Sequence, residues 1–405
     1  MSTVTKPILL NETGETIADL IEAQNHLFSH LNASVDLLAA DKRAELVTNV
    51  AEVALFAKNG ELLEVMDYGD EIHPEWVYGE THYNPPMNLC HESDELLEDG
   101  ESIHGCFFEW DKTIPHGVVW DAPQAIFESE SPLPAGTYYF TVANDSWGNN
   151  NGKNIQFTLT EELPAGGQIR KSSAYNQLVT SGTLDVYASA DSLTKLYSMT
   201  PTEGTSGTFL GTTDGTGDLN YWQKVALGHN RWKTSSARQY LNATGSRGTW
   251  WNKQEKWQVK PSLADTTDGF LYGYAEEVYR YFKPIKVTTV ACNFDGNEED
   301  VTYDRVFLSS LEQMYCVPQF SGKEGEYWEY YKRLLGRTTP APTAETYPRL
   351  IKYAINSPTS AQYCWHRSAY RNNADYVWFV NTSGSVYTSN ATNSNRLAPS
   401  VFISD

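Results

Sequence analysis

The pattern that most constrains the fold lies between residues 60 and 162, where apolar residues come in short alternating runs. Runs such as HGCFFEW, QAIFES and TYYFTVA are rich in aromatic and β-branched residues, and turn clusters such as SPLPAGT separate them. Alternation with a period of two is typical of half-buried strands. The segment predicts a small antiparallel β domain, a sandwich or jelly roll, over residues 59–165.

The first 58 residues have a different pattern, which predicts a helix over residues 14–58. Apolar residues recur at alternating steps of about four and three, over about three heptads, with Gln24 as the one polar member. Two interpretations stay open: a short coiled coil that makes a homo-oligomer, with a trimer favoured, or a helix packed on its own domain. The apolar positions are Ile17, Ile21, Phe28, Leu31, Val35 and Leu38.

The rest of the chain predicts one compact unit with both helices and strands. Residues 166–182 predict a linker into this unit, which spans residues 183–405. RWKTSSARQYLNA predicts a short helix with Thr234 or Ser235 as its N-cap, and IKVTTVACNF predicts a strand. We therefore expect an α+β protein with an N-terminal helix, an antiparallel β domain and a C-terminal unit.

The charge of the chain argues against several classes of partner. The formal net charge is −21 and no cluster of Lys or Arg occurs, whereas a phosphate backbone requires a basic surface. No apolar run approaches the length of a membrane-spanning helix, and the start lacks the pattern of a signal peptide. We expect no nucleic acid partner, no membrane insertion and synthesis in a reducing cytoplasm.

Neither the cysteines nor the histidines are spaced as in known metal or catalytic motifs. Five of the nine histidines fall in the predicted β domain, without the HxH or HxxxH spacing that places two imidazoles on one face. No P-loop, no GxGxxG and no nucleophile–His–acid set can be found. We expect no metal, no cofactor and no catalytic residue. The cysteines, odd in number and without a CxxC pair, are Cys90, Cys106, Cys292, Cys316 and Cys364.

The end of the chain has an unusual composition. After residue 352 it contains neither Lys nor Glu, and from Tyr363 to Asn395 18 of 33 residues are Asn, Ser, Thr or Tyr. Binding surfaces of antibodies are enriched in the same types, because Tyr supplies rigid contact area and Asn and Ser supply adaptable hydrogen bonds. Ordinary surface loops and turns are the alternative explanation.

Four blocks of sequence carry a resemblance to a known domain. Together they resemble an uncharacterised domain of gut Firmicutes and their phages, over about residues 219–405. That domain is similar to the C-type-lectin-like folds of formylglycine-generating enzymes and of phage tropism determinants. His366 stands where the domain usually has Leu. The blocks are HNRWKTSSARQYLN (His229–Asn242), GFLYGYAEEV (Gly269–Val278), TYDRVFLSSLEQMY (Thr302–Tyr315) and the stretch Cys364–Ile403.

The tail further resembles the variable region of a diversity-generating retroelement target, here residues 363–395. In such systems a reverse transcriptase miscopies adenines of a template, and the copy overwrites the end of the target gene. Scrambled Asn codons reach many amino acids and never a stop codon, whereas Lys AAA and Glu GAA codons can mutate to stops. The resemblance therefore accounts for the absence of Lys and Glu.

The resemblance implies a division of the tail into ligand-binding and scaffold residues. In this division Trp378 and Val380 point inward, while Tyr376, Phe379 and Asn381 face the ligand. The implied scaffold residues are Trp365, Arg367, Val377, Trp378, Val380, Gly384, Val386, Leu397, Pro399 and Phe402. The implied ligand-binding residues are His366, Tyr370, Asn372, Asn373, Asp375, Tyr376, Phe379, Asn381, Ser385, Tyr387, Thr388, Ser389, Asn390, Thr392, Asn393 and Asn395.

The implied function is that of a receptor-binding or adhesion protein on a phage virion, at a tail or head fibre. Its ligand would be a bacterial surface protein or glycan, and its N-terminal segment would oligomerise and contact other virion proteins. A structural virion protein without a receptor is one alternative. An enzyme of the formylglycine-generating type is another, for which Cys316 and Cys364 are the candidate thiols. A calcium lectin is disfavoured because neither Glu-Pro-Asn nor Trp-Asn-Asp occurs.

Overall fold

The structure is a computed structural model that describes most of the chain from residue 49 onward. Helices and antiparallel strands both occur, which confirms the predicted α+β class. The described residues are 21–22, 24–29, 42, 45–46, 49–142, 153–171, 183–200, 202–203, 208–209, 224, 227–255, 258–316, 323–341 and 345–405.

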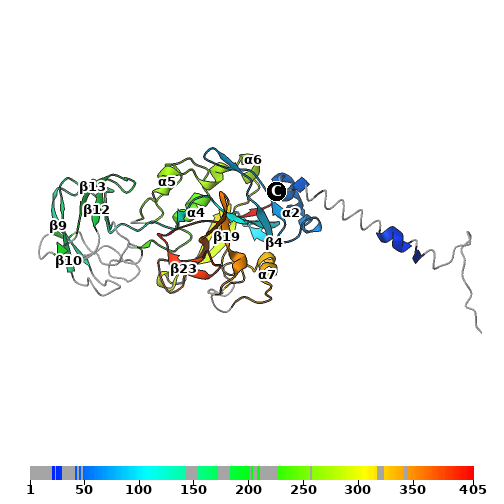
Figure 1. Cartoon of the computed structure of the whole chain (residues 1–405). Coiled ribbons are helices and arrows are strands. Elements are labelled where there is room, and N and C mark those ends of the chain that lie inside the picture. Colours follow the sequence, from blue (N-terminus) through cyan, green and yellow to red (C-terminus); the bar gives the residue numbers. More distant parts are fainter. Residues whose placement is uncertain are drawn as a thin grey trace, which may run out of the picture.

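A five-stranded sheet forms the centre of the larger body of the molecule (Figure 1). All of its strand pairs are antiparallel, and the last strand of the chain, β25, pairs along its whole length with β5. Strands from both ends of the sequence are therefore neighbours in one sheet. The order is β1 (Glu71–Ile72), β4 (Met87–Leu96), β5 (Ser102–Trp110), β25 (Ser400–Ile403) and β18 (Val306–Phe307).

Aromatic packing joins β5 to β25. Phe107 and Phe402 lie opposite each other in the register, with ring centroids 5.0 Å apart. Beside them, a Cβ at Gly105 would lie 2.6 Å from the carbonyl oxygen of Ile403 and 2.7 Å from the ring of Phe402. Only glycine allows this close approach without a shift of the backbone. Burying each Phe side chain is worth about 1.5–3 kcal/mol.

This sheet overturns the predicted domain boundaries. The prediction assigned residues 59–165 to one domain and residues 183–405 to another, yet β4 and β5 pair with strands from the second segment. Alternation along a strand indicates which side chains are buried, but the partner strand is set by the tertiary structure. The predicted division is therefore wrong.

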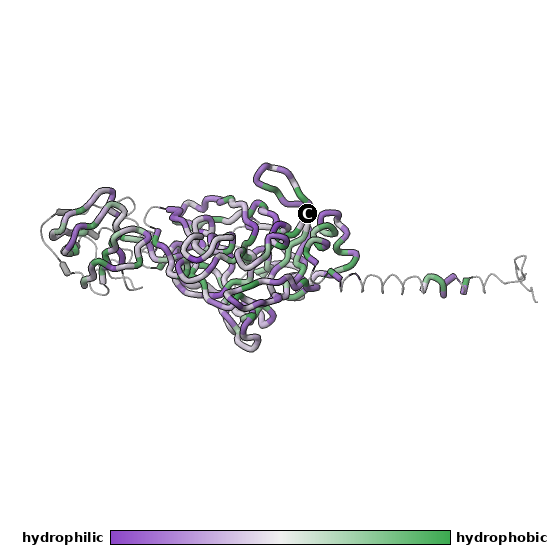
Figure 2. Tube along the Cα trace, turned by 90° about the horizontal axis from the view of Figure 1, so that it is seen from above, coloured by the Kyte–Doolittle hydropathy of each residue, from purple (hydrophilic) through white to green (hydrophobic). Residues whose placement is uncertain are grey.

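A separate β unit of two four-stranded sheets lies at one end of the molecule (Figures 1 and 2). The two sheets share a cluster of buried apolar residues that includes Phe140, Phe157 and Ile169. This sandwich-like unit begins later in the chain than predicted, and the predicted linker contains its strand β11. The first sheet has the order β13 (Lys195–Met199), β12 (Leu184–Tyr187), β11 (Gln168–Lys171) and β8 (Phe127–Glu128). The second sheet has the order β14 (Thr202–Glu203), β10 (Lys153–Leu159), β9 (Gly136–Val142) and β15 (Thr208–Phe209).

Helix α2 (Val50–Asn59) packs on the larger body. The side chain of Asn49 caps its N-terminus by accepting a hydrogen bond from the backbone N–H of Glu52, and Gly60 ends it with a φ of 72°. Val53 and its apolar neighbours are buried in the main core. This part of the helix predicted over residues 14–58 therefore packs on its own domain.

The heptad positions before α2 are described only in part. Ile21 and Phe28 lie in helical segments, and they are 53% and 54% exposed in the single chain. The other four positions, Ile17, Leu31, Val35 and Leu38, lie outside the described residues. The oligomer interpretation of this segment stays a prediction.

Short elements complete the larger body. Ser235 is the N-cap of α4, because its hydroxyl accepts a hydrogen bond from the N–H of Arg238 at 3.1 Å. No helix in the described part of the chain is long and apolar enough to cross a membrane. The helices are η1 (Leu62–Glu64), α4 (Ser236–Leu241), α5 (Leu263–Thr266), η2 (Phe270–Gly273), α6 (Glu276–Tyr279), η3 (Asn293–Asp295), α7 (Glu329–Leu335) and η4 (Pro348–Leu350).

The remaining strands form small sheets, and the three-stranded sheet near the end of the chain carries the candidate site. The strands are β2 (Trp76–Tyr78), β3 (Thr81–Tyr83), β6 (Lys112–Thr113), β7 (Val118–Val119), β16 (Ile285–Val290), β17 (Glu299–Asp304), β19 (Lys352–Ala354), β20 (Ser357–Gln362), β21 (Cys364–Ala369), β22 (Tyr376–Val380), β23 (Val386–Asn390) and β24 (Ser394–Asn395).

Candidate functional site

The antiparallel sheet β21–β22–β23 holds most of the predicted variable region. Phe379 in the middle strand pairs with Trp365 on one side and with Tyr387 on the other. Because side chains alternate along a strand, Phe379 and Tyr387 share one face of the sheet, while Tyr376 and Trp378 share the opposite face. The predicted ligand-binding residues are therefore divided between two faces.

One face carries a group of residues that we call the tyrosine patch: Tyr363, Tyr387, Ser389 and Asn393. Tyr363 and Tyr387 are 49% and 64% exposed, and each ring packs edge-on against Phe379, at centroid distances of 5.6 and 6.3 Å. The amide of Asn393 donates a hydrogen bond to the hydroxyl of Ser389 at 2.5 Å. The patch presents aromatic rings and small polar groups without a charged side chain.

A buried tryptophan supports the tyrosine patch from below. Trp365 packs edge-on against Phe379 at a centroid distance of 5.9 Å, and its indole N–H donates to the carbonyl oxygen of Val118 at 3.1 Å. Phe379 itself is 7% exposed. The exposed tyrosines thus rest on a packed aromatic layer, which limits the conformations they can adopt.

The opposite face of the sheet is more enclosed. Tyr370 packs against Tyr376 and Trp378, with ring centroids 6.1 and 5.6 Å apart. Trp378 is buried, whereas Tyr370 and Tyr376 are half-buried. The prediction that Trp378 points inward is confirmed, but Tyr376 lies on the same face as Trp378 rather than with Phe379.

Four predicted ligand-binding residues are buried, so their assignment to an exposed face is wrong. Phe379 lies beneath two tyrosines, and Asn395 belongs to β24, which pairs with β7. The ring of His366 lies 3.3 Å from the hydroxyl of Ser309, and burial lowers its pKa to about 4. Asp375 is fully buried, and burial raises its pKa to about 7. None of the four reaches solvent far enough to contact a ligand.

Asn381 has a structural role in the turn between β22 and β23. Its side-chain oxygen accepts hydrogen bonds from the backbone N–H groups of Ser383 and Ser385, both at 2.9 Å. Gly384 follows with a φ of 85°, and a Cβ there would collide with the backbone of Tyr347. The side-chain carbonyl group of Asn381 therefore fixes the turn.

The other predicted ligand-binding residues vary in exposure. Three are exposed: Asn372, Tyr387 and Asn393. Nine are half-buried: Tyr370, Asn373, Tyr376, Asn381, Ser385, Thr388, Ser389, Asn390 and Thr392. All residues predicted as scaffold are buried, as expected: Trp365, Arg367, Val377, Trp378, Val380, Gly384, Val386, Leu397, Pro399 and Phe402.

Asn230 was not among the predicted site residues, yet it holds the loop between β21 and β22. This buried side chain donates hydrogen bonds to the carbonyl oxygens of Asn373 at 2.7 Å and Tyr376 at 2.9 Å. Its backbone N–H donates to the carbonyl oxygen of Ala374 at 2.9 Å. The one signal in the sequence that pointed to Asn230 was its place in the block His229–Asn242. A single Asn in a sequence does not indicate which backbone groups its side chain will bind.

A buried ionic network lies next to Asn230. His229 contacts Glu255 through Nδ1 at 3.1 Å and Asp295 through Nε2 at 2.8 Å, and Lys224 contacts Asp295 at 2.7 Å. Burial alone would lower the pKa of His229, but the hydrogen bonds to both carboxylates raise it above the ordinary value. The network links three segments of the chain and is best explained as structural.

The described thiols are not activated as nucleophiles. All five cysteines are buried and unpaired. Burial raises the pKa of Cys316 and of Cys364 to about 12, so both stay protonated at neutral pH. Within the described residues, no group of three His, Cys, Asp or Glu side chains is placed to hold a metal ion.

The comparisons with known proteins connect the site to a family without an assigned function. Residues 205–403 match a domain of unknown function, DUF6273. The matched range contains the whole sheet β21–β22–β23 and excludes β4 and β5, although β5 pairs with β25. Searches among curated proteins and among solved structures return no match.

Proposed function

We propose that the protein is a receptor-binding or adhesion protein of a phage virion, and that the tyrosine patch contacts its ligand. The observation that carries this proposal is the exposure of Tyr363 and Tyr387 on a buried aromatic layer. Rigid, exposed tyrosines beside small polar groups supply contact area at little entropic cost. The ligand in this proposal is a protein or glycan of the bacterial surface.

The finer parts of the proposal rest on the resemblance of the four sequence blocks. These parts are a C-type-lectin-like fold for the C-terminal unit, diversification of residues 363–395 by a retroelement, and a place on the virion surface. The N-terminal segment would form a homo-oligomer, with a trimer favoured, and would contact other virion proteins. The composition of the tail and its position on one small sheet support this proposal.

A structural decoration protein without a receptor is the second candidate. The observation that favours it is the burial of Phe379 and the limited number of exposed residues, three of sixteen, among those predicted to bind a ligand. An enzyme of the formylglycine-generating type is less well supported, because its candidate thiols Cys316 and Cys364 are buried and protonated.

Binding to bacterial cells tests the proposal. Fluorescently labelled protein is incubated with a panel of gut Firmicutes, and the variant Tyr363→Ala/Tyr387→Ala is compared with the parent. We expect at least a tenfold loss of binding, since aromatic anchors carry much of the energy of an interface. Tyr272→Ala is the matched control, because Tyr272 is 54% exposed but lies outside the patch. Equal binding by the patch variant and the parent would exclude the tyrosine patch as the ligand-binding surface.

The neighbouring DNA tests the diversification separately. We expect a near-copy of codons 363–395 beside a reverse transcriptase gene, differing from the target where the template has adenine. Absence of such a copy would contradict diversification by a retroelement. It would not bear on the proposed binding role, which the cell experiment tests.

A further inference from the structure

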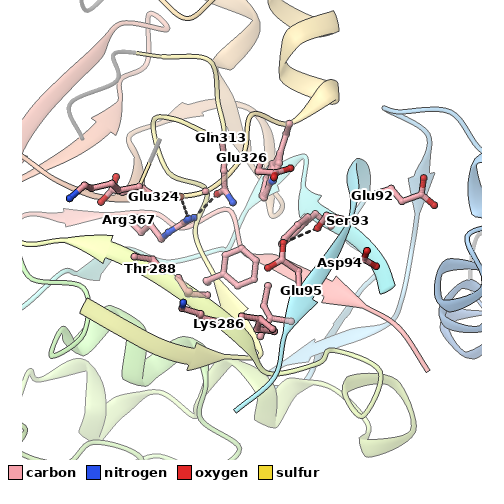
Figure 3. A pocket seen from close by; sticks show the side chains of 18 residues that line it. Glu92, Ser93, Asp94, Glu95, Lys286, Thr288, Gln313, Glu324, Glu326 and Arg367 are labelled. Carbon is pink, nitrogen blue, oxygen red and sulfur yellow. Dashed lines mark hydrogen bonds between the residues drawn. The ribbon is translucent and has the colours of Figure 1, made fainter. Parts of the chain in front are cut away.

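A pocket of about 560 Å³ lies between strands β4 and β16 and the segment 323–328 (Figure 3). This volume is within the range of sites that bind small ligands. Phe107, Phe307 and Trp328 form its apolar floor, and all three are almost completely buried. The pocket is distinct from the tyrosine patch, whose residues do not line it.

Strand β16 turns an unpaired edge toward this pocket. Among the described strands, its one partner is β17. The backbone N–H of Ala291 donates to the carbonyl oxygen of Glu298, so every second residue back from Ala291 bonds to β17. The residues in between, Lys286 and Thr288, direct their backbone N–H and C=O groups away from β17, and both line the pocket.

Strand β4 turns a second edge toward the pocket. One side of β4 pairs with β5, and among the described strands β1 covers the other side only near the beginning of β4. The N–H of Leu97 donates to the carbonyl oxygen of Glu101 at 2.9 Å. By the same alternation Asp94, which also lines the pocket, directs its backbone groups away from β5.

The edge of β16 is closed at both ends and open in the middle. An antiparallel bridge joins Ile285 to Leu97 at the beginning, and at the other end the carboxylate of Glu324 accepts a hydrogen bond from the N–H of Val290 at 3.0 Å. The open part lies between these two points. Unpaired backbone groups on a strand edge are a template for another strand, and the length of this opening suits a short peptide.

The exposed charges at the rim of the pocket favour a basic partner. The side chains of Asp94 and Glu326 are 72% and 84% exposed, and both line the pocket. Three cations line it as well, but Arg367 is buried among carboxylates and Lys323 is held in an ion pair. Lys286 is therefore the one cation of this lining that is left to offset the exposed carboxylates.

We propose that this pocket binds a short, extended, basic peptide, which adds a strand along the open edge of β16. Its backbone exchanges hydrogen bonds with Thr288. Because side chains alternate along a strand, one row packs on the apolar floor and the other row places Lys or Arg beside Asp94 and Glu326. The main-chain bonds supply affinity and the two rows supply specificity. The proposal goes beyond the cell-binding function and does not depend on it.

Fluorescence anisotropy of labelled tetrapeptides with the full chain tests both requirements. The basic probe alternates lysine and valine and has blocked ends, and the acidic probe has glutamate in place of lysine. Two further basic probes are N-methylated, one at the lysine nitrogens and one at the valine nitrogens, so that each loses the donors on one side of the strand.

We expect the basic probe to bind roughly tenfold more tightly than the acidic probe, and at least one N-methylated probe to bind roughly tenfold more weakly than its parent. The proposal is overturned if the basic probe does not bind, or if the acidic probe binds equally well. It is also overturned if both N-methylated probes bind as tightly as the parent, because the backbone would then make no hydrogen bonds.

A double variant locates the binding at the pocket. Asp94→Asn/Glu326→Gln is expected to weaken the basic probe roughly tenfold, through the loss of charge-assisted contacts. Glu98→Gln/Glu101→Gln is the matched control, since both residues are exposed carboxylates that do not line the pocket. Equal affinity of the two double variants for the basic probe would overturn the proposed site.

Discussion

The side-chain amide of Asn230 donates a hydrogen bond to the carbonyl oxygen of Tyr376, over 2.9 Å, at the beginning of strand β22. The same amide reaches the carbonyl oxygen of Asn373, so one buried side chain fixes both ends of a short turn. The orientation of the candidate binding sheet therefore depends on a residue far from it in the sequence.

Replacing Asn230 with alanine is expected to destabilise the protein. The substitution removes the hydrogen bonds to the carbonyl oxygens of Asn373 and Tyr376, and the carbonyl of Tyr376 keeps a bond from the backbone N–H of Tyr370. Each lost hydrogen bond is worth about 0.5–1.5 kcal/mol, so we expect the free energy of unfolding in a urea titration to fall by about 1–3 kcal/mol. Asn372→Ala is the control, because Asn372 is exposed and surface changes stay within about 0.5 kcal/mol. Equal stability of the two variants would contradict this role of Asn230.

Truncation of Phe379 is expected to destabilise the protein much more than truncation of Tyr387. Phe379→Ala removes a buried ring from the aromatic layer and should lower the free energy of unfolding by about 3–5 kcal/mol. Tyr387→Ala removes a ring that is 64% exposed and should change it by less than about 1 kcal/mol. Thermal unfolding followed by near-ultraviolet circular dichroism measures both. A larger effect for Tyr387 would show that its ring is packed.

Asp375 is expected to make stability fall as pH rises. Burial raises its pKa to about 7 in the folded state, so folding favours its protonated form. The stabilising effect of the bound proton is complete below the unfolded pKa of about 3.9 and is lost as pH rises through about 7. Asp375→Asn removes this dependence.

The measurement for Asp375 is the difference in unfolding free energy between variant and parent at two pH values. We expect that difference to shift in favour of Asp375→Asn by about 2–4 kcal/mol between pH 4 and pH 8. Burial also raises the pKa of Asp121 and of Glu324 to about 7. Both groups are present in variant and parent, so their contributions to the pH dependence cancel in the difference. A difference that does not change with pH would contradict the prediction.

Phe28→Glu is expected to dissociate an oligomer of the full chain. Phe28 is 54% exposed in the single chain and occupies a heptad position, so a second copy would bury it. A carboxylate buried in such a seam without a partner costs several kcal/mol. Light scattering after size exclusion measures the mass, with Asn25→Glu as a control outside the heptad positions. A monomeric parent, or an unchanged mass for Phe28→Glu, would contradict the oligomer interpretation and favour a helix that packs on its own domain.

The sequence by itself determined the local properties of this protein. Alternating apolar runs predicted strands such as β5 and β9, and the cap at Ser235 begins α4. These features depend on neighbours in the sequence, through side-chain alternation and local hydrogen bonds, and they can be recognised without knowing the fold.

Only the tertiary structure decided which segments meet. The pairing of β25 with β5 and the hydrogen bonds from Asn230 to the loop between β21 and β22 join residues that are far apart in the sequence. The burial of Phe379 also depends on Tyr363 and Tyr387 covering it. Strand partners and burial are set by the packing of the whole chain, because an alternating pattern specifies a face but not what covers that face.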